Sequence, residues 1–235
     1  MRKDALRRVR RFDAKQWPVL SALLIQDAID ATLRARKRCS VMLTGGRSAE
    51  RLYKAWAKLP AFQRLENVGF FFGDERCVPP DHPASNYGMV RRTLFAGGVP
   101  TGCSIFRMEG EDQNCEAAAC RYEQILPDRM DVLLLGVGED GHIASLFPRS
   151  ASLRESIRRV VDVNGPKPPQ RRLTIVPSVI AQARSIFVLA IGVAKAEVFA
   201  KTMLEPGDFD NLPARLVLNA TWLLDAELPE ETFHE

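Results

Sequence analysis

Apolar and polar positions follow one another along this chain in blocks that predict strands and helices by turns. Short apolar runs at residues 40–43, 68–72, 131–135 and 185–191 have the length of strands buried on both faces. Between such runs lie longer stretches, as at residues 18–37, whose apolar positions recur at helical spacing. Because strands that alternate with helices pair in parallel, the pattern predicts an α/β fold. We expect a single domain over residues 1–235, with a mainly parallel sheet and helices on both faces.

Further elements follow from the same pattern. The run at 68–72 (VGFFF) is aromatic and apolar throughout, so it is expected at the centre of the sheet. Ser48 is expected to cap a helix that reaches Lys58, and Ser85 or Asn86 to cap the next. The remaining expected strands are 104–108, 159–163 and 172–176, and the remaining expected helices are 112–126 and a short one from Pro177.

Composition and charge exclude several classes of function. The chain has 46% hydrophobic and 26% charged residues, as soluble globular proteins do, and no apolar run approaches the length of a membrane span. Residues 1–15 form a basic arm with seven Lys/Arg against two Asp/Glu. No apolar stretch typical of a secretory signal follows the arm, and no aromatic interleaving typical of nucleic-acid binding accompanies it. We therefore expect a cytoplasmic protein with no nucleic-acid or membrane partner.

The five cysteines are odd in number and form no CxxC pair. This pattern supports neither a disulfide framework nor a zinc site, and it fits a reducing compartment. No metal is expected.

Candidate chemistry is concentrated in residues 131–148, DVLLLGVGEDGHIASLFP. An apolar strand ends here at Gly136, and Gly138 and Gly141 let the backbone turn sharply behind it. In open α/β sheets the ligand crevice lies at the carboxyl ends of the strands. His142 can take a proton near neutral pH in that position, and Asp140 can orient its ring. The stretch predicts an acid/base site.

Two further strand ends carry polar residues. Thr44, Gly45, Gly46, Arg47 and Ser48 form a strand-to-helix turn, whose free N–H groups and helix dipole suit a phosphate. The turn is neither a GxxxxGK[ST] loop nor a GxGxxG fingerprint, so the use of ATP or NAD is not supported.

The second is the expected strand at 68–72, which leads into GDERCVPPDHPASNY. It places Asp74, Glu75 and Arg76 in the same layer as the two sites above. His82, in the same stretch, is expected at the surface.

These motifs together resemble the 6-phosphogluconolactonases. The family's strand-LG-x-G-x-DGH-x-ASLFP and DER-x-VP…SNY motifs match closely, whereas Thr44 and Ala49 replace the usual Ser and Pro of the glycine turn. The resemblance spans about residues 40–225 and implies a modified Rossmann-like fold, as in glucosamine-6-phosphate deaminase. It implies catalytic roles for His142, Asp140 and Arg76. The implied substrate and phosphate ligands are Gly45, Gly46, Arg47, Ser48, Asp74, Glu75, Asn86, Arg172 and Lys195.

The implied activity is hydrolysis of 6-phospho-D-glucono-1,5-lactone to 6-phosphogluconate, with no cofactor, in a monomer or homodimer. His142 would activate the attacking water. Arg76 would stabilise either the oxyanion or the phosphate. Two alternatives stay open: a glucosamine-6-phosphate deaminase, although such enzymes typically read DEY where this chain has Asp74-Glu75-Arg76, and a non-catalytic sugar-phosphate sensor.

Overall fold

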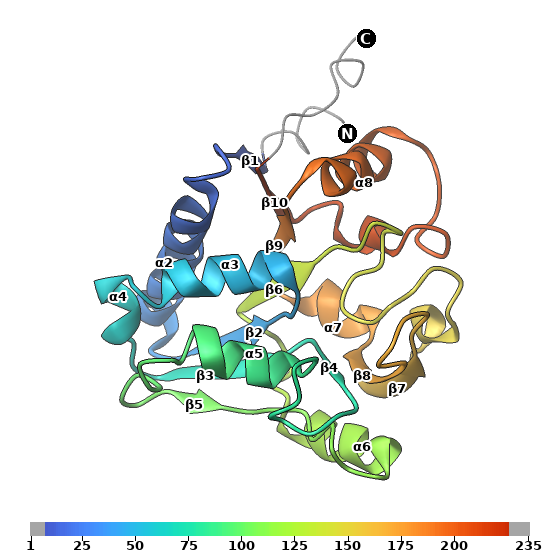
Figure 1. The fold of residues 1–235 in the computed structure, drawn as a ribbon, viewed down its shortest axis with the longest axis horizontal. Coiled ribbons are helices and arrows are strands. Elements are labelled where there is room, and N and C mark those ends of the chain that lie inside the picture. The colour runs from blue at the N-terminus through green and yellow to red at the C-terminus, as the bar shows by residue number, and fades with distance from the viewer. Residues whose placement is uncertain (1–7, 226–235) are drawn as a thin grey trace.

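A seven-stranded sheet forms the centre of the protein (Figure 1), in a computed structural model that describes residues 8–225. The strand order is β1-β10-β9-β6-β2-β3-β5, and all neighbouring strands are parallel. The parallel sheet predicted from the sequence is thereby confirmed. Its strands are β1 (Val9–Arg11), β2 (Cys39–Leu43), β3 (Val68–Phe72), β5 (Ser104–Ile105), β6 (Val132–Gly136), β9 (Ser185–Ala190) and β10 (Thr221–Leu224).

Helices cover both faces of this sheet, because its strands are apolar on both sides. In β6, Val132 and Leu134 pack into one core with α2, α3 and α5, whereas Leu133 and Leu135 pack into another with α6, α7 and α8. The helices are α2 (Trp17–Arg36), α3 (Arg47–Trp56), α4 (Pro60–Gln63), α5 (Asn86–Thr93), α6 (Cys115–Ile125), α7 (Pro177–Gln182) and α8 (Val193–Leu204), with short 3₁₀ turns η1 (Ala151–Arg154) and η2 (Pro213–Val217). None of the helices within residues 8–225 is long and apolar enough to cross a bilayer.

A second, three-stranded sheet was not anticipated. It has the order β4-β8-β7, with β4 (Asp74–Arg76), β7 (Val160–Asn164) and β8 (Arg171–Ile175), and both of its pairings are antiparallel. A loop without a helix joins β7 to β8, so the two strands form a hairpin. The chain enters this sheet directly from β3 through Gly73, whose carbonyl accepts a hydrogen bond from Ile175. The three residues after Gly73 therefore form a strand and not a loop.

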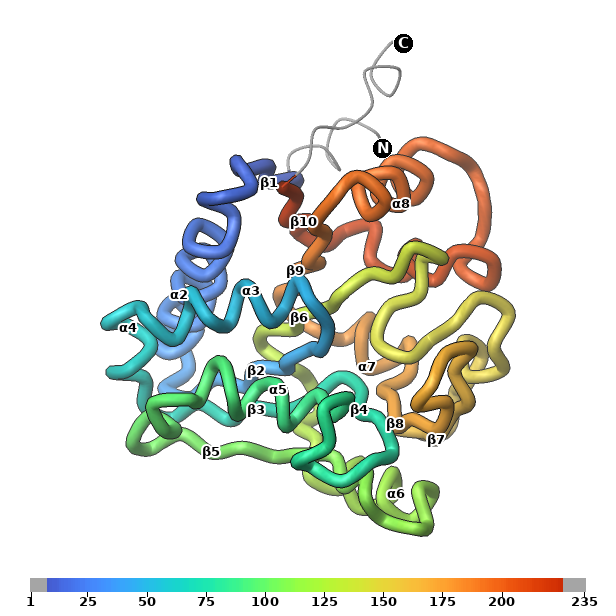
Figure 2. Tube along the Cα trace, in the orientation of Figure 1, coloured from blue at the N-terminus to red at the C-terminus, as the bar shows by residue number. Residues whose placement is uncertain are grey.

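Several sequence expectations need correction. β3 is next to the edge strand β5 and not at the centre of the sheet; it is buried on both faces because the helical layers extend over it. The strand expected at 104–108 has two residues, and the helix expected from 112 begins at Cys115. Residues 9–11 of the basic arm form a strand that pairs with β10, so the two ends of the described chain meet (Figure 2). Residues 1–7 of the arm lie outside the described residues.

The order of the strands defines where a ligand crevice should open. From β2 the chain passes through α3 to β3 on one side, whereas from β6 it continues to β9 on the other side. A crevice forms at such a topological switch point, beyond the carboxyl ends of the two strands. In this protein β2 leads into the glycine turn, residues 44–48. β6 leads into the turn that contains Asp140, Gly141 and His142, here called the DGH turn.

Candidate active site

A cavity of about 780 Å³ opens at this switch point. It is lined by the turns after β2 and β6, by β4 and β8, by the start of α5 and by Lys195 of α8. Ten of the residues predicted from the sequence contribute to its lining: Gly45, Gly46, Arg47, Asp74, Arg76, Asn86, Asp140, His142, Arg172 and Lys195. Segments that are far apart in the sequence thus meet around one volume large enough for a sugar phosphate.

His142 and Asp140 form the closest polar pair in this cavity. The Nδ1 atom of the imidazole lies 2.5 Å from Oδ1 of Asp140, and the ring packs against Phe147 at a centroid distance of 4.9 Å. Burial acts to raise the pKa of Asp140, but the hydrogen bond and charge of His142 outweigh it and lower that pKa. A carboxylate on Nδ1 favours the tautomer in which Nε2 is unprotonated, and that nitrogen can then accept a proton.

The backbone of the DGH turn leaves just enough room for this pair. The N–H of Gly138 donates to the carbonyl of His142, and Gly141 closes the turn with a φ of 81°. A Cβ at position 138 would lie 2.1 Å from Nδ1 of His142 and 2.6 Å from Oδ1 of Asp140. Gly138 is therefore a steric requirement of the pair, and not only a flexible residue.

The side chain of Tyr53 fixes the first residue of the glycine turn after β2. The Tyr53 hydroxyl accepts a hydrogen bond from the Thr44 N–H and donates one to the Thr44 carbonyl, both 2.9 Å long. Gly46, with a φ of 92°, is the N-cap of α3. Ser48 is consequently inside the helix, and the expectation that it caps α3 was wrong. Its hydroxyl does not line the cavity; it accepts a hydrogen bond of 3.1 Å from Nζ of Lys195.

Lys195 extends from α8 toward the glycine turn. Burial, and secondarily the charge of Arg47, lower the pKa of its ammonium group. Two cations beside free N–H groups at a helix N-terminus are the chemistry that an anion site requires.

Strand alternation decides which of Asp74, Glu75 and Arg76 reach the cavity. Side chains point to opposite faces at successive positions of β4, so Asp74 and Arg76 line the cavity and Glu75 does not. The buried Glu75 carboxylate instead accepts hydrogen bonds from the backbone N–H groups of Arg76, Asn86 and Tyr87 and from the Ser85 hydroxyl. Glu75 was predicted to bind substrate; the structure places it behind the wall, where it fixes the start of α5.

Asp74 and Asn86 share one buried network. The Asn86 amide donates to the carbonyl and to Oδ1 of Asp74, while the hydroxyl of Ser145 donates to Oδ2 at 2.7 Å. Ser85 caps α5 through the N–H of Gly88, as expected. The Asn86 amide also packs against Gly45. A Cβ at position 45 would lie 1.9 Å from Oδ1 of Asn86.

Arg172 contributes its guanidinium to the wall of the cavity. Its Cζ lies 5.4 Å from the Phe147 ring centre, and it donates to the carbonyls of Pro169 and Lys167. Arg172 therefore ties the loop 165–170 to the cavity, whose lining includes Pro166 and Lys167. Burial, followed by the nearby charge of Arg76, lowers the pKa of Arg172. Arg76 donates to the carbonyl of Ala84, but its buried Nε has no hydrogen-bond partner among the described residues.

Some lining residues were not identified from the sequence. Lys167 lies in the proline-rich loop, and Glu139, Ala144 and Phe147 belong to the segment 131–148, where the sequence analysis assigned them no role. Ala144 has a φ of 49°, which is unusual for a residue with a Cβ. No local sequence pattern points to Lys167. His82 is exposed, as predicted.

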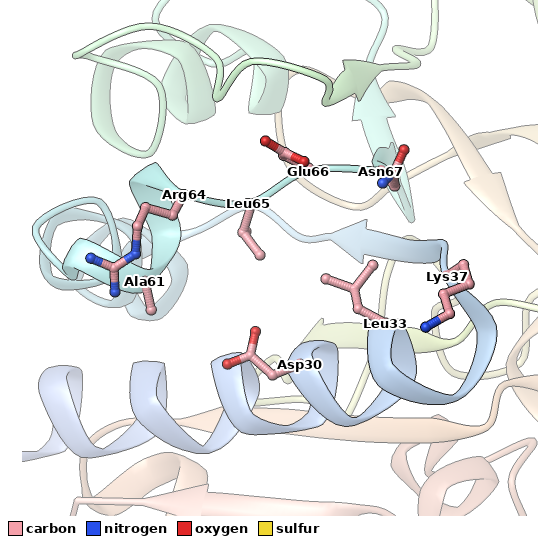
Figure 3. Close-up of a pocket in the computed structure, with 8 residues that line it drawn as sticks. All are labelled: Asp30, Leu33, Lys37, Ala61, Arg64, Leu65, Glu66 and Asn67. Carbon is pink, nitrogen blue, oxygen red and sulfur yellow. The ribbon is translucent and has the colours of Figure 1, made fainter.

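A smaller hollow of about 430 Å³ lies between α2 and the segment after α4, next to the residues that precede β2 and β3 (Figure 3). Asp30, Lys37, Arg64 and Glu66 surround it with charges of both signs. It contains no histidine or nucleophile, so we place the functional site in the larger cavity. Within residues 8–225, no cluster of three or more His, Cys, Asp or Glu side chains is arranged to hold a metal ion.

Comparison with known proteins gives a consistent result. Residues 14–224 match the family described as glucosamine-6-phosphate isomerases/6-phosphogluconolactonase. The chain is 33% identical to the 6-phosphogluconolactonase of Mycobacterium leprae, over 92% of this chain and 94% of that one. It is 34% identical to that of Streptomyces coelicolor, over 88% and 86%. Among solved structures, the 6-phosphogluconolactonase of Trypanosoma brucei superposes with a TM-score of 0.81 at 27% identity, covering 95% of this chain and 97% of that one.

Proposed function

The chain belongs to the family of glucosamine-6-phosphate isomerases and 6-phosphogluconolactonases, and from that membership we propose that it hydrolyses 6-phospho-D-glucono-1,5-lactone to 6-phosphogluconate. The observation that supports this best is the His142–Asp140 pair in a cavity that is also lined by five cations, Arg47, Arg76, Lys167, Arg172 and Lys195. A phosphorylated lactone needs both features: an anion site at one end and a base at the carbonyl.

In this proposal the phosphate is bound at the glycine turn. The N–H groups of Gly45 and Gly46, together with Arg47 and Lys195, supply donors and positive charge at the start of α3. The Arg172 guanidinium adds a further cation to the lining of the cavity. Binding energy from this remote group fixes the lactone carbonyl against the catalytic residues.

His142 acts as the general base. Nε2 removes a proton from water as the water attacks C1, and the imidazolium then returns a proton to the ring oxygen as that oxygen leaves. Asp140 holds the ring through Nδ1 and stabilises the imidazolium. Arg76 stabilises the negative charge on the carbonyl oxygen with its guanidinium, which lines the cavity. Asn86 and Asp74 contact the sugar hydroxyls.

Two parts of the sequence interpretation remain part of this proposal. A cytoplasmic location is supported by five cysteines that are all free thiols. A monomer or a homodimer fits a cavity built from one chain.

The deaminase alternative is less well supported, because Arg76 lines the cavity at the position where deaminases typically carry Tyr. The sensor alternative leaves the His142–Asp140 pair without a role.

The decisive experiment follows lactone hydrolysis in real time, with the substrate generated in situ, against the spontaneous rate. We expect the wild type to accelerate hydrolysis and His142→Ala to lose a factor of about 10² to 10⁴ in kcat/KM. His82→Ala is the matched control, because that imidazole is exposed and does not line the cavity.

The three outcomes are distinct. Acceleration that survives His142→Ala keeps the activity and discards the mechanism. No acceleration by the wild type contradicts the proposed function, and ammonia release from glucosamine 6-phosphate is then the next assay. Binding of the sugar phosphate without turnover of either substrate would favour a sensor.

A further inference from the structure

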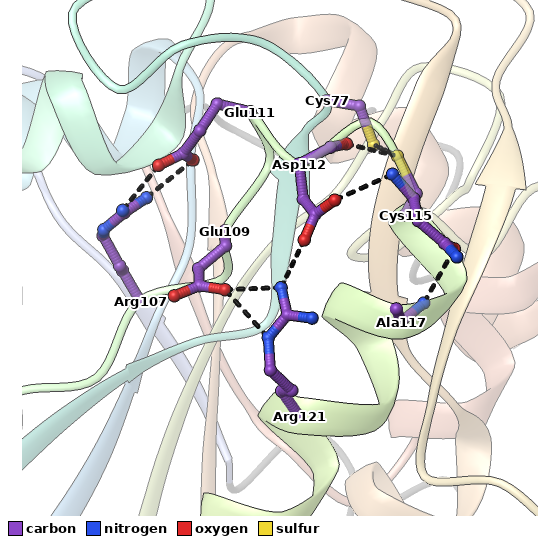
Figure 4. Close-up of polar contacts among 9 residues, drawn as sticks. Cys77, Arg107, Glu109, Glu111, Asp112, Cys115, Ala117 and Arg121 are labelled. Atoms are coloured by element: carbon purple, nitrogen blue, oxygen red, sulfur yellow. Dashed lines mark hydrogen bonds and ion pairs between the residues drawn. The ribbon is translucent and has the colours of Figure 1, made fainter.

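Two cysteines outside the cavity lie face to face. The sulfur atoms of Cys77 and Cys115 are 2.9 Å apart, although the residues are 38 positions apart in the sequence (Figure 4). Cys77 directly follows β4 and Arg76, and Cys115 is the first residue of α6. Neither residue belongs to the cavity lining or to the mechanism proposed above.

The backbone holds both cysteines in place independently of their thiols. The N–H of Cys77 donates to the carbonyl of Arg171, which ties it to β8. Before Cys115, Asn114 caps α6 by accepting from the Ala117 N–H at 3.0 Å. Arg121 binds both Glu109 and Asp112 and so braces the segment that leads into α6 (Figure 4).

The segment before α6 also packs closely on the other cysteine's strand. A Cβ at Gly110 would lie 2.3 Å from the carbonyl oxygen of Arg76, so only glycine permits this approach. The two sulfur atoms are therefore brought together by packing of the main chain. They need to move by only about 0.9 Å to reach the S–S bond length of about 2.05 Å.

The remaining cysteines are arranged differently. The Cys39 thiol is buried, that of Cys103 donates to the carbonyl of Leu65, and that of Cys120 accepts from Arg158. Among residues 8–225, Cys77 and Cys115 form the one thiol pair for which a sulfur–sulfur contact is found. Cys77 is partly exposed whereas Cys115 is buried, so a small oxidant from solvent meets Cys77 first.

We propose that Cys77 and Cys115 form a redox-active dithiol, which a peroxide converts into an intramolecular disulfide. The Cys77 thiol first loses its proton, the thiolate attacks one peroxide oxygen, and the O–O bond breaks. Cys77 becomes a sulfenic acid, and the hydroxide that leaves takes up a proton to become one water. The sulfur of Cys115 then attacks the Cys77 sulfur, the S–O bond breaks, and the hydroxyl group leaves as a second water with the Cys115 proton. Each sulfur loses one electron and the peroxide gains two.

The cross-link has a specific structural consequence. It closes a loop that contains α5 and Asn86, and it anchors the backbone directly behind Arg76. Since the sulfurs already face each other, the cavity keeps its shape and the disulfide restricts the unfolded chain. Burial raises the pKa of the Cys77 thiol, so formation of the disulfide is expected to be slower than at an exposed cysteine.

The test treats the folded, fully reduced chain with one equivalent of hydrogen peroxide, then blocks free thiols and digests without reductant. We expect a cross-linked peptide pair containing Cys77 and Cys115, lighter by about 2 Da than the two reduced peptides because two hydrogens are lost. The melting temperature should rise by about 5–10 °C and return to its starting value after reduction. This readout does not depend on turnover, so its failure is distinguishable from failure of the proposed function.

Two variants control the test. Cys115→Ala should lose the cross-link and the rise in melting temperature, and should leave Cys77 as a sulfenic acid that a diketone reagent traps. Cys120→Ser keeps the pair intact and should behave as the wild type. The proposal is overturned if Cys77 and Cys115 are both alkylated after peroxide treatment, or if Cys77 is over-oxidised while Cys115 stays a free thiol.

Discussion

Arg76 and Arg172 are directly opposite each other on the antiparallel strands β4 and β8. Cross-strand partners point to the same face of a sheet, and here both guanidinium groups face the cavity. Like charges in this position repel each other, and the charge of Arg76 contributes to the lowered pKa of Arg172. An anion bound between them removes that repulsion. We therefore expect an anionic ligand to bind between the two guanidinium groups.

The first prediction concerns this pair. Arg172→Gln should weaken binding of 6-phosphogluconate by a factor of about 10 to 100, because a charge-assisted hydrogen bond contributes about 1.5–3 kcal/mol. Titration calorimetry measures the affinity directly. Arg171→Gln is the matched control, since Arg171 is exposed and points away, toward Asp162 at 3.7 Å. Equal affinities for the two variants would show that Arg172 has no part in anion binding.

The second prediction separates the two acidic neighbours in the DGH turn. Asp140→Asn should lower kcat by about 10- to 10³-fold with little change in KM, because the imidazole loses its oriented carboxylate. Glu139→Gln should instead lower KM, because Glu139 places a negative charge near Lys195. Steady-state kinetics of both variants distinguishes these effects. A fall in kcat for Glu139→Gln, with none for Asp140→Asn, would show that Glu139 and not Asp140 positions the imidazole.

The sequence predicted the parts of this site that depend on neighbours along the chain. A strand followed by glycines and a histidine can turn in few ways, so the positions of His142 and Asp140 follow from local structure. The parallel sheet follows in the same way from alternating strands and helices. Gly46, however, takes the capping position expected for Ser48, because the turn needs a positive φ one residue before the helix.

Features that depend on pairing with distant residues were not predicted. Glu75 seemed equivalent to Asp74 and Arg76 as long as the three residues were read as a loop. Only the pairing of β4 with β8, almost a hundred residues away, turns Glu75 from the cavity. The same holds for β1, whose partner β10 is at the other end of the chain. Lys167 reaches the cavity because Arg172 binds the carbonyls of its loop, a contact without a local sequence pattern.

The third prediction tests the space behind the imidazole. Gly138→Ala would place a methyl group 2.1 Å from Nδ1 of His142, so the ring must move and the pair with Asp140 must break. We expect kcat/KM to fall by at least about 10²-fold, since a displacement of about 1 Å can have that effect. Gly97→Ala is the control, because a Cβ there meets no atom within 4 Å. Full activity of Gly138→Ala would contradict the assigned geometry.

The fourth prediction is a pH dependence of ligand binding. The lowered pKa of Lys195 means that, in the free protein, its ammonium group loses its proton below the usual lysine pKa of about 10.4. Binding of an anion requires the charged form, so affinity should fall as pH rises through that lowered pKa. Above about pH 8 a phosphomonoester is fully ionised and does not itself titrate. The affinity for 6-phosphogluconate, measured from pH 8 upward, reports this loss.

Lys195→Arg provides the control for that titration. A guanidinium keeps its charge throughout the range, so the affinity of this variant should not decline in the same window. Lys201→Arg, an exposed position on the same helix, should decline as the wild type does. If all three proteins decline together, a group other than Lys195 controls anion binding.

The fifth prediction concerns the support beneath the glycine turn. Tyr53→Phe removes the hydroxyl that binds both the N–H and the carbonyl of Thr44, and it leaves two buried backbone groups unsatisfied. The free energy of unfolding should fall by about 1–3 kcal/mol. Because Thr44 leads directly into Gly45 and Gly46, the affinity for a phosphate-bearing ligand should fall as well. Chemical denaturation and calorimetry measure the two effects separately.

Tyr122 provides a matched comparison, because its hydroxyl makes the same two backbone contacts with Phe72 at the end of β3. Tyr122→Phe should lower stability by a similar amount, since the same kinds of buried hydrogen bond are lost. Its effect on phosphate affinity should be smaller, because Phe72 does not belong to the glycine turn. If both variants weaken phosphate binding equally, the loss reflects general destabilisation, and the turn does not depend on Tyr53 for its shape.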